Sequence, residues 1–281
     1  MKPISFSKFL YFLAPLEDNS DNSLRTLCFN HGADYTFTEM TRLQGLIQNN
    51  KETLSKILFH DSTPTIIQLL AGNEKSLNMF LKNFKPQKGF SGFNLNLGCP
   101  SPDVIKLGLG CAFVKRVAKT QKLIDVFRKY NYPISVKLRI GMNLKEKQKK
   151  VYLNLIKNTF PDFFIVHSRH GKQKYIEPAD FSIYEDCVKT GKIIVANGDI
   201  KDKSQIDYLK SIGVKGVMIG RAAVWNPAIF DLLKEKPCSN TESLKKEYII
   251  LANKFKSKDK YKNNVIKRIG KDKDIDAERL I

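Results

Sequence analysis

The chain has 281 residues, 42% of them hydrophobic and 27% charged, a composition that excludes wholesale disorder, a coiled rod and a disulfide-stabilised mini-protein. Its 48 lysines and arginines outnumber its 28 acidic residues and give a formal net charge of +20, which favours a polyanionic partner such as nucleic acid. Only nine of the basic residues are arginine, so a general lysine bias is the competing explanation of the charge.

The five cysteines lie far apart, none of them in a C-x-x-C pair, and their number is odd. Neither a zinc ribbon nor a disulfide framework fits this pattern, which predicts a reducing, cytoplasmic location and no metal site. The longest early apolar stretch, residues 9–15, is about seven residues long, and this is too short to span a bilayer. We therefore expect no membrane segment.

Short apolar runs alternate with amphipathic segments along most of the chain. The runs predict eight strands, at residues 9–14, 34–39, 64–70, 92–97, 133–138, 162–167, 192–197 and 214–220. Apolar residues at helical spacing predict eight helices, near residues 21–31, 50–59, 74–83, 120–130, 144–158, 180–190, 202–211 and 226–234. Asn73 and Asp202 are the expected N-caps, and Gly32, Gly191 and Gly213 the expected helix stops.

Eight strand and helix alternations predict an α/β fold, a (β/α)8 TIM barrel over residues 1–236, because strands buried on both faces read as continuous apolar runs. A doubly wound open sheet is the competing architecture. From residue 237 to 281 the sequence becomes lysine-rich, with a net charge of +5. This region predicts a short helical extension, with a helix over 241–256 followed by a second helix or a fraying end.

Polar or reactive side chains stand at the ends of the predicted strands, where a barrel builds its active site. They are Glu39, Gln68, Asn96 with Cys99, Lys137 with Arg139, His167 with Arg169, Asn197 with Asp199, and Gly220 with Arg221. Taken singly, Lys137 is more simply a surface charge and His167 a core histidine, but together they form a set of donors.

Cys99 carries the most specific signal, since it directly follows a strand and precedes a proline in the segment NLGCPSP. A thiol with the ordinary pKa of ~8.5 is mostly protonated at neutral pH, so it can donate a proton over the barrel mouth. The alternative is a buried small hydrophobe, the usual role of a free cysteine.

The last two strands end in the glycine loops ANGDI and VMIGRA. Barrels commonly bind phosphate with the loops after strands seven and eight, and Gly198 and Gly220 allow close backbone approach while Arg221 offers a charged fork. The alternative is a pair of tight turns. We favour a phosphate site.

The motifs occur in an order that is specific only as a set. They are APLE (14–17) with Arg25, TEM (38–40), Gln68, NLGCP (96–100), VKLR (136–139), HSR (167–169) with Tyr175, NGD (197–199) and GRAAVWNP (220–227). In this combination the chain resembles the flavin-dependent tRNA-dihydrouridine synthases, and the resemblance covers the whole barrel.

The resemblance implies an FMN across the barrel mouth, with NADPH or NADH as the reductant and a uridine of tRNA as the substrate. Its expected cofactor-binding residues are Pro15, Leu16 and Glu17 along the flavin, Gln68 and Lys137 at its ring, His167 nearby, and Asn197, Gly198, Asp199, Gly220 and Arg221 at its phosphate end. Cys99, and not Cys111, would protonate C5 of the uracil while C6 receives a hydride. The expected substrate-binding residues are Asn96, Arg139, Arg169 and Tyr175.

Two other functions remain as alternatives. One is an FMN barrel oxidoreductase that acts on a small molecule, similar to dihydroorotate dehydrogenase, and the other is a barrel that binds RNA without catalysis. We expect a monomer whose basic tail guides tRNA toward the barrel mouth. The competing explanation is that residues 241–256 cover an apolar patch of the barrel with Tyr248, Ile249, Leu251 and Phe255.

Overall fold

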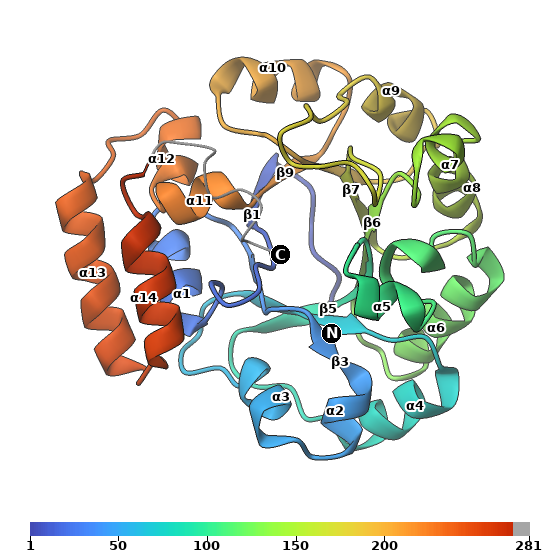
Figure 1. Cartoon of the computed structure of the whole chain (residues 1–281), viewed down its shortest axis with the longest axis horizontal. Helices are drawn as coiled ribbons and strands as arrows, with labels where there is room; N and C mark the ends of the chain where they lie inside the picture. The colour runs from blue at the N-terminus through green and yellow to red at the C-terminus, as the bar shows by residue number, and fades with distance from the viewer. Residues whose placement is uncertain (272–281) are drawn as a thin grey trace.

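The computed structural model describes residues 1–271 as a ring of parallel strands surrounded by helices (Figure 1). The eight barrel strands are β1 Leu10–Leu13, β2 Thr36–Phe37, β4 Thr65–Leu70, β5 Phe90–Leu97, β6 Ile134–Arg139, β7 Phe163–His167, β8 Ile194–Asn197 and β9 Gly216–Ile219. Neighbours follow the order β1-β9-β8-β7-β6-β5-β4-β2, and a parallel bridge between Phe12 and Tyr35 brings the ring close to closure. The predicted barrel is confirmed, and the open sheet is excluded.

Helices cover the outside of the barrel between successive strands. The principal ones are α1 Asn22–Asn30, α4 Glu74–Asn83, α6 Val117–Lys129, α8 Val151–Asn158, α9 Ile183–Val188, α10 Lys203–Ser211 and α12 Ile229–Leu233. Shorter elements lie in the connections: β3 Thr41–Arg42, α2 Leu43–Ile47, α3 Lys51–Lys56, α5 Pro102–Lys106, the 3-10 helix η1 Gly110–Phe113, α7 Leu144–Gln148 and α11 Arg221–Trp225. None of the helices within residues 1–271 combines the length and the apolarity needed to cross a bilayer.

The helix boundaries follow the capping residues in the sequence. The Asn73 side chain accepts a hydrogen bond from the backbone of α4, and Asp202 forms a capping box at the start of α10. Gly32, Gly191 and Gly213 all have positive φ angles after helix ends, as a left-handed stop requires. All five predictions are confirmed.

Two predicted elements differ from the structure. The helix expected over 144–158 is broken into α7 and α8, because Lys150 takes a left-handed conformation with φ 51°. The lysine-rich first half buries no side chain, so nothing holds it in line with the apolar face of α8. The strand expected over 34–39 shortens to β2, since the chain turns there to form β3.

The strands bury both faces, which explains their continuous apolar runs. Leu10 and Phe12 point into the barrel with Ile165, Val195 and Met218. Alternate strand residues point outward and pack with the helices in the larger core. The barrel is therefore a filled core, and polar groups reach solvent only at its ends.

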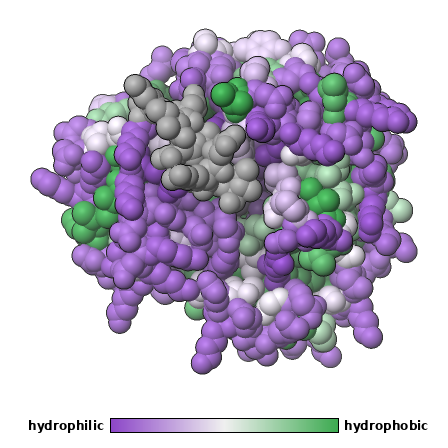
Figure 2. Space-filling view, in the orientation of Figure 1, coloured by the Kyte–Doolittle hydropathy of each residue, from purple (hydrophilic) through white to green (hydrophobic). Residues whose placement is uncertain are grey.

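The C-terminal region forms a helical hairpin of α13 Thr241–Lys254 and α14 Asp259–Arg268 (Figure 1). Helix α13 packs on α1, and α14 packs on α13 and α11. Tyr248, Leu251 and Phe255 are buried, whereas Ile249 is exposed. The hairpin thus covers an apolar patch with three of the four expected residues, and the face in Figure 2 is otherwise dominated by hydrophilic residues.

Candidate active site at the barrel mouth

The loop that carries Cys99 is fixed by the side chain of Asn96 on β5. Its Oδ1 accepts hydrogen bonds from the backbone N–H groups of Gly98, at 3.0 Å, and Cys99, at 2.9 Å. Its Nδ2 donates to Oε1 of Gln68 on β4 at 2.8 Å, and Gln68 donates in turn to Asn94. Both ends of the Asn96 amide are therefore used to hold the cysteine loop against the barrel.

Cys111 supports the same loop from the opposite side. Its N–H donates to the Cys99 carbonyl at 3.0 Å, and its thiol donates to the Gly98 carbonyl at 3.0 Å. A Cβ at Gly110 would collide with the Cys99 carbonyl oxygen, so the glycine permits this close approach. Sequence reasoning missed this role, because the hydrogen bonds join segments that only the fold brings together.

The two thiols differ in exposure. Cys99 is half-buried and Cys111 is fully buried. Burial raises the pKa of Cys99 above its ordinary value, and it raises the pKa of Cys111 to about 12. Cys99 is therefore a protonated thiol at neutral pH with access to the mouth, whereas Cys111 is a neutral structural donor.

Lys137 and His167 stand on β6 and β7, close to this loop. Burial, followed by the positive charge of Arg139, lowers the pKa of Lys137 to about 7. The same two causes hold the pKa of His167 well below its usual range, so this histidine is neutral. Within residues 1–271, no hydrogen bond or ion pair engages the Lys137 ammonium group.

Three arginines surround the ring of Tyr175 on the other side of the mouth. The guanidinium carbon of Arg221 lies 4.5 Å from the ring centroid, and those of Arg139 and Arg169 lie 5.5 Å from it. His167 stacks on the same ring at 6.2 Å. These contacts bring residues from β6, from the end of β7 and the loop after it, and from the start of α11 into one cluster.

Asp199 is the carboxylate that pairs with two of these arginines. It accepts hydrogen bonds from both Nη atoms of Arg169 and, at 2.8 Å, from Nη2 of Arg221. The cluster holds three guanidinium groups and Asp199 pairs with two of them, so the cluster keeps a positive charge. The Nη1 atom of Arg221 is buried and has no hydrogen-bond partner within residues 1–271.

The glycine loops after β8 and β9 lie beside this cluster. Gly198 has φ 120°, and a Cβ there would approach the His167 ring to 2.9 Å. Asn197 donates from Nδ2 to the Met218 carbonyl at 2.9 Å, which ties β8 to β9. Gly220 forms the N-terminal boundary of α11, and a Cβ there would touch only Ala14 and Leu16 at 3.6 Å. The backbone next to Arg221 is thus open to a ligand.

The loop after β1 completes the rim with Pro15, Leu16 and Glu17. Ser20 Oγ accepts the Leu16 N–H at 2.9 Å and donates to the Leu16 carbonyl, which closes a tight turn. Glu17 is half-buried and forms an ion pair with Lys56 of α3. The mouth is therefore bounded on this side by a carboxylate that a lysine compensates.

A cavity of about 260 Å³ opens next to the Cys99 loop. It is lined by Pro100, Ser101, Pro102, Arg139 and residues 171–175. Of the four residues expected to bind the substrate, Arg139 and Tyr175 line this cavity. Asn96 and Arg169 do not, because Asn96 holds the cysteine loop and Arg169 is buried in hydrogen bonds to the Tyr175 and Glu177 carbonyls and to Asp199.

The chain is similar in sequence to proteins of one enzyme family. The family model described as "Dihydrouridine synthase (Dus)" matches residues 12–277. A protein of Aquifex aeolicus named "Probable tRNA-dihydrouridine synthase" is 26% identical over 245 residues, which cover 83% of this chain and 75% of that protein. A rat protein named "tRNA-dihydrouridine(47) synthase [NAD(P)(+)]-like" is 27% identical over 239 residues, which cover 84% of this chain.

The match spans only 37% of the rat protein, so that relative has a large part with no counterpart here. Among solved structures, a morphinone reductase mutant in complex with tetrahydroNAD has a TM-score of 0.55 at 8% identity, covering 85% of this chain and 90% of that one. This likeness concerns the barrel fold alone. The family model, which covers nearly the whole chain, shows that the protein belongs to the dihydrouridine synthase family.

Proposed function

We propose that this protein is a tRNA-dihydrouridine synthase that uses FMN and NADPH or NADH to reduce the C5–C6 double bond of a uridine in the tRNA D-loop. The observation that carries the proposal is the Cys99 thiol, which is kept protonated and held at the mouth of the barrel by Asn96 and Cys111. When bound, FMN supplies the hydride, so the protein must supply position, charge and a proton.

The residues of the mouth fit an FMN in two respects. The buried Nη1 of Arg221 has no partner in the described chain and stands beside the open backbone of Gly220, which suits a phosphate group. Lys137 stands at the mouth on β6 with its pKa lowered to about 7, and its amine suits a polar edge of the flavin ring. Asp199 would act on the phosphate through Arg221, since its own charge repels a phosphate.

The substrate uracil would occupy the cavity between the Cys99 loop and Tyr175. Arg139 and the Tyr175 hydroxyl, which are hydrogen-bonded at 3.1 Å, would orient the base. Cys99 would then deliver its proton to C5 as general acid. A uridine inside a folded tRNA must leave its stacked position to enter this cavity, and the positive arginine cluster favours the accompanying phosphates.

Two observations disfavour the alternatives. A small-molecule oxidoreductase does not need a net charge of +20, and a barrel that only binds RNA does not need a protonated cysteine in a rigid loop. We propose a cytoplasmic monomer, in line with its free cysteines and its tRNA substrate.

The proposal is tested in two steps. The purified protein should show the visible absorption bands of oxidised flavin, which a barrel that only binds RNA would lack. tRNA from cells that lack the gene should lose dihydrouridine at one or more D-loop positions, and the wild-type gene should restore it. A yellow protein whose loss leaves every dihydrouridine in place would instead support the small-molecule alternative.

A further inference from the structure

The last helix of the described chain, α14, contacts the loop after β1 at two consecutive residues, Asp18 and Asn19. Asn264 donates from Nδ2 to the Asp18 carbonyl at 3.0 Å, and Arg268 donates to Asn19 Oδ1 at 3.3 Å. Lys260 forms an ion pair with Asp18 at 2.7 Å. A helix nearly 250 residues further along the chain therefore holds this loop through the backbone of Asp18 and the side chain of Asn19.

The same helix reaches a buried carboxylate at the barrel mouth. The hydroxyl of Tyr261 donates to Oε2 of Glu39 at 2.8 Å, and both side chains are buried. Lys56 lies 3.4 Å from the same Oε2 atom and pairs with Glu17 as well. Tyr261, Glu39, Lys56 and Glu17 thus form one chain of polar contacts from α14 to the loop after β1.

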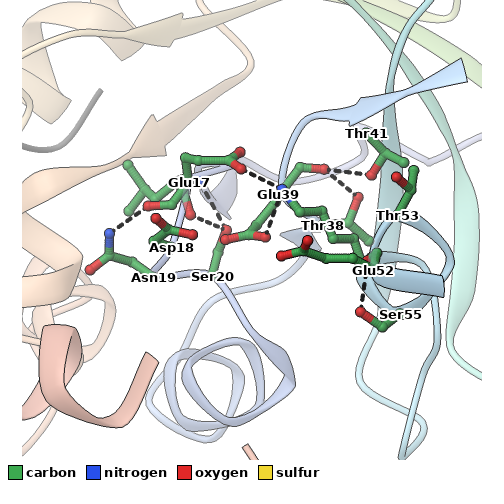
Figure 3. A network of polar contacts seen from close by, with 12 residues as sticks. Glu17, Asp18, Asn19, Ser20, Thr38, Glu39, Thr41, Glu52, Thr53 and Ser55 are labelled. Atoms are coloured by element: carbon green, nitrogen blue, oxygen red, sulfur yellow. Dashed lines mark hydrogen bonds and ion pairs between the residues drawn. The ribbon is translucent and has the colours of Figure 1, made fainter. Parts of the chain in front are cut away.

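Figure 3 shows how Glu17 and Glu39 approach each other from two different loops. The Glu39 carbonyl accepts hydrogen bonds from the hydroxyls of Thr38 and Thr41, and the Thr38 hydroxyl accepts the backbone N–H of Gln68. Glu39 is therefore anchored to β4 at its backbone and to α14 at its carboxylate. Its position cannot change without moving both.

We propose that α14 is a structural part of the flavin site, with Tyr261 as a positioning residue that holds Glu39, Lys56 and through them Glu17, and with Asn264 as a second brace on the same loop. The inference rests on the proposed function only in that Pro15, Leu16 and Glu17 line the FMN. It gives the hairpin a role that its basic charge does not suggest. Removing the hairpin would then loosen the cofactor site as well as any tRNA contact.

Hydrogen–deuterium exchange of the apoprotein tests the positioning role without any cofactor. The amides of Leu16, Asn19 and Ser20 are hydrogen-bonded within the loop, so they report whether the loop stays closed. Tyr261→Phe and Asn264→Ala should each speed their exchange at least about threefold, as loss of one hydrogen bond predicts. Unchanged exchange in both variants would overturn the proposal.

The chain offers a matched control for each variant. Tyr248 on α13 is a second buried tyrosine of the hairpin, and its hydroxyl has no partner within residues 1–271, so Tyr248→Phe removes a hydroxyl without breaking a hydrogen bond. Asn263 is the exposed neighbour of Asn264, so Asn263→Ala changes the same helix without touching the loop. Equal effects of control and test variants would show general packing and overturn the specific role.

FMN affinity adds a readout that depends on charge. Burial and the nearby Glu17 raise the pKa of Glu39, while Lys56 and the Tyr261 hydroxyl lower it. The charged or titratable groups that face Glu39 are Glu17 and Asp18 from the loop after β1, Arg25 from α1, Lys56 from α3, and Lys260 and Tyr261 from α14. Protonation of Glu39 would remove one of the two carboxylates that hold Lys56, so FMN binding should weaken as the pH falls.

In Tyr261→Phe the pKa of Glu39 should rise further, because the hydroxyl no longer stabilises the carboxylate. FMN should bind about threefold to tenfold more weakly, and the loss of FMN affinity on acidification should begin at a higher pH. A pH dependence of FMN affinity that does not shift in Tyr261→Phe would overturn the role of Glu39 in passing the effect to the loop.

If loop exchange responds but the wild-type protein binds no FMN, the proposed function fails while the positioning role stands. Should Tyr261→Phe not fold, Asn264→Ala and its control decide the matter.

Discussion

The two sides of the barrel mouth are built from different chemistry. On the side of β4 and β5, uncharged amides from Gln68, Asn94 and Asn96 form a hydrogen-bonded ladder that ends at Cys99. On the side of β7 to β9, charged groups dominate, and a single carboxylate, Asp199, pairs with two of the arginines around Tyr175. The neutral side fixes an acid in place, while the charged side keeps a surplus of positive charge for a ligand.

This contrast teaches that one set of residues positions the Cys99 thiol, and a separate set supplies the positive charge that attracts a ligand. A satisfied amide ladder orients the cysteine without adding a charge that would ionise its thiol. An arginine cluster attracts anions. Its member Arg139 lowers the pKa of Cys99, but burial raises that pKa more, so the thiol stays protonated. Changes on the two sides should therefore separate flavin retention from uridine reduction.

The largest expected effect in the charged side comes from Arg221→Ala. Its buried Nη1 donor, which has no partner among residues 1–271, should hold the FMN phosphate, so the dissociation constant of FMN should rise at least about tenfold. Equilibrium dialysis with the visible spectrum measures the loss. Stoichiometric FMN in Arg221→Ala after long dialysis would contradict the phosphate site.

Arg139 lines the substrate cavity, so Arg139→Ala should raise the KM for tRNA and retain FMN.

Lys137→Met tests the electrostatics between the two sides. The pKa of Lys137 is lowered to about 7 in the folded protein, so between about pH 7 and the ordinary lysine value of 10.5 the unfolded chain binds more protons. Wild-type stability should rise with pH in this window, because the cost of the buried charge is fully present below pH 7.

At pH 6, Lys137→Met apoprotein should be more stable than wild type by about 1–2 kcal/mol, a figure reduced for the partial exposure of Lys137. Chemical denaturation at pH 6 measures this gain in the free energy of unfolding, and the same measurement at pH 9.5 shows whether the gain is lost at high pH. Lys149→Met, at an exposed lysine, is the control: it keeps Lys137, so its stability should rise with pH as that of the wild type does. A gain that does not depend on pH would point to packing instead of charge.

A smaller effect is expected from Cys111, which supports the neutral side. Cys111→Ala removes the thiol donor to the Gly98 carbonyl, so uridine reduction should fall about two- to fivefold through a looser Cys99 loop. Cys111→Ser keeps a donor and should recover most of the rate. Single-turnover kinetics with tRNA measure both variants, and loss of all activity in Cys111→Ala would instead make Cys111 the acid.

The sequence predicted the features that depend on local pattern. Strand runs, the caps Asn73 and Asp202, and the clustering of strand-end residues all follow from short-range chemistry, and the barrel follows from their order. It did not predict which partners the strand-end side chains select. The roles of Asn96 and Arg169 at the uracil stay predictions, and no sequence motif indicates the amide, carbonyl and Asp199 partners that the fold gives them.

Long-range contacts explain the remaining difference. Tyr261 meets Glu39 across more than 200 residues, and no periodicity or motif connects two such positions. The charge of the tail predicted a contact with tRNA, and its helical spacing predicted the alternative of an apolar packing face. Burial of Tyr248, Leu251 and Phe255 confirms the packing face. Its contact with tRNA stays a prediction.

The most direct test of the account separates the two half-reactions of Cys99→Ala under anaerobic conditions. The variant should bind FMN and be reduced by NADPH at the wild-type rate, because the flavin and its phosphate are held by other residues. Reoxidation of the reduced enzyme by tRNA should slow by at least ~10²-fold, as loss of a general acid predicts. Reoxidation at the wild-type rate would contradict the central claim that Cys99 is the proton donor.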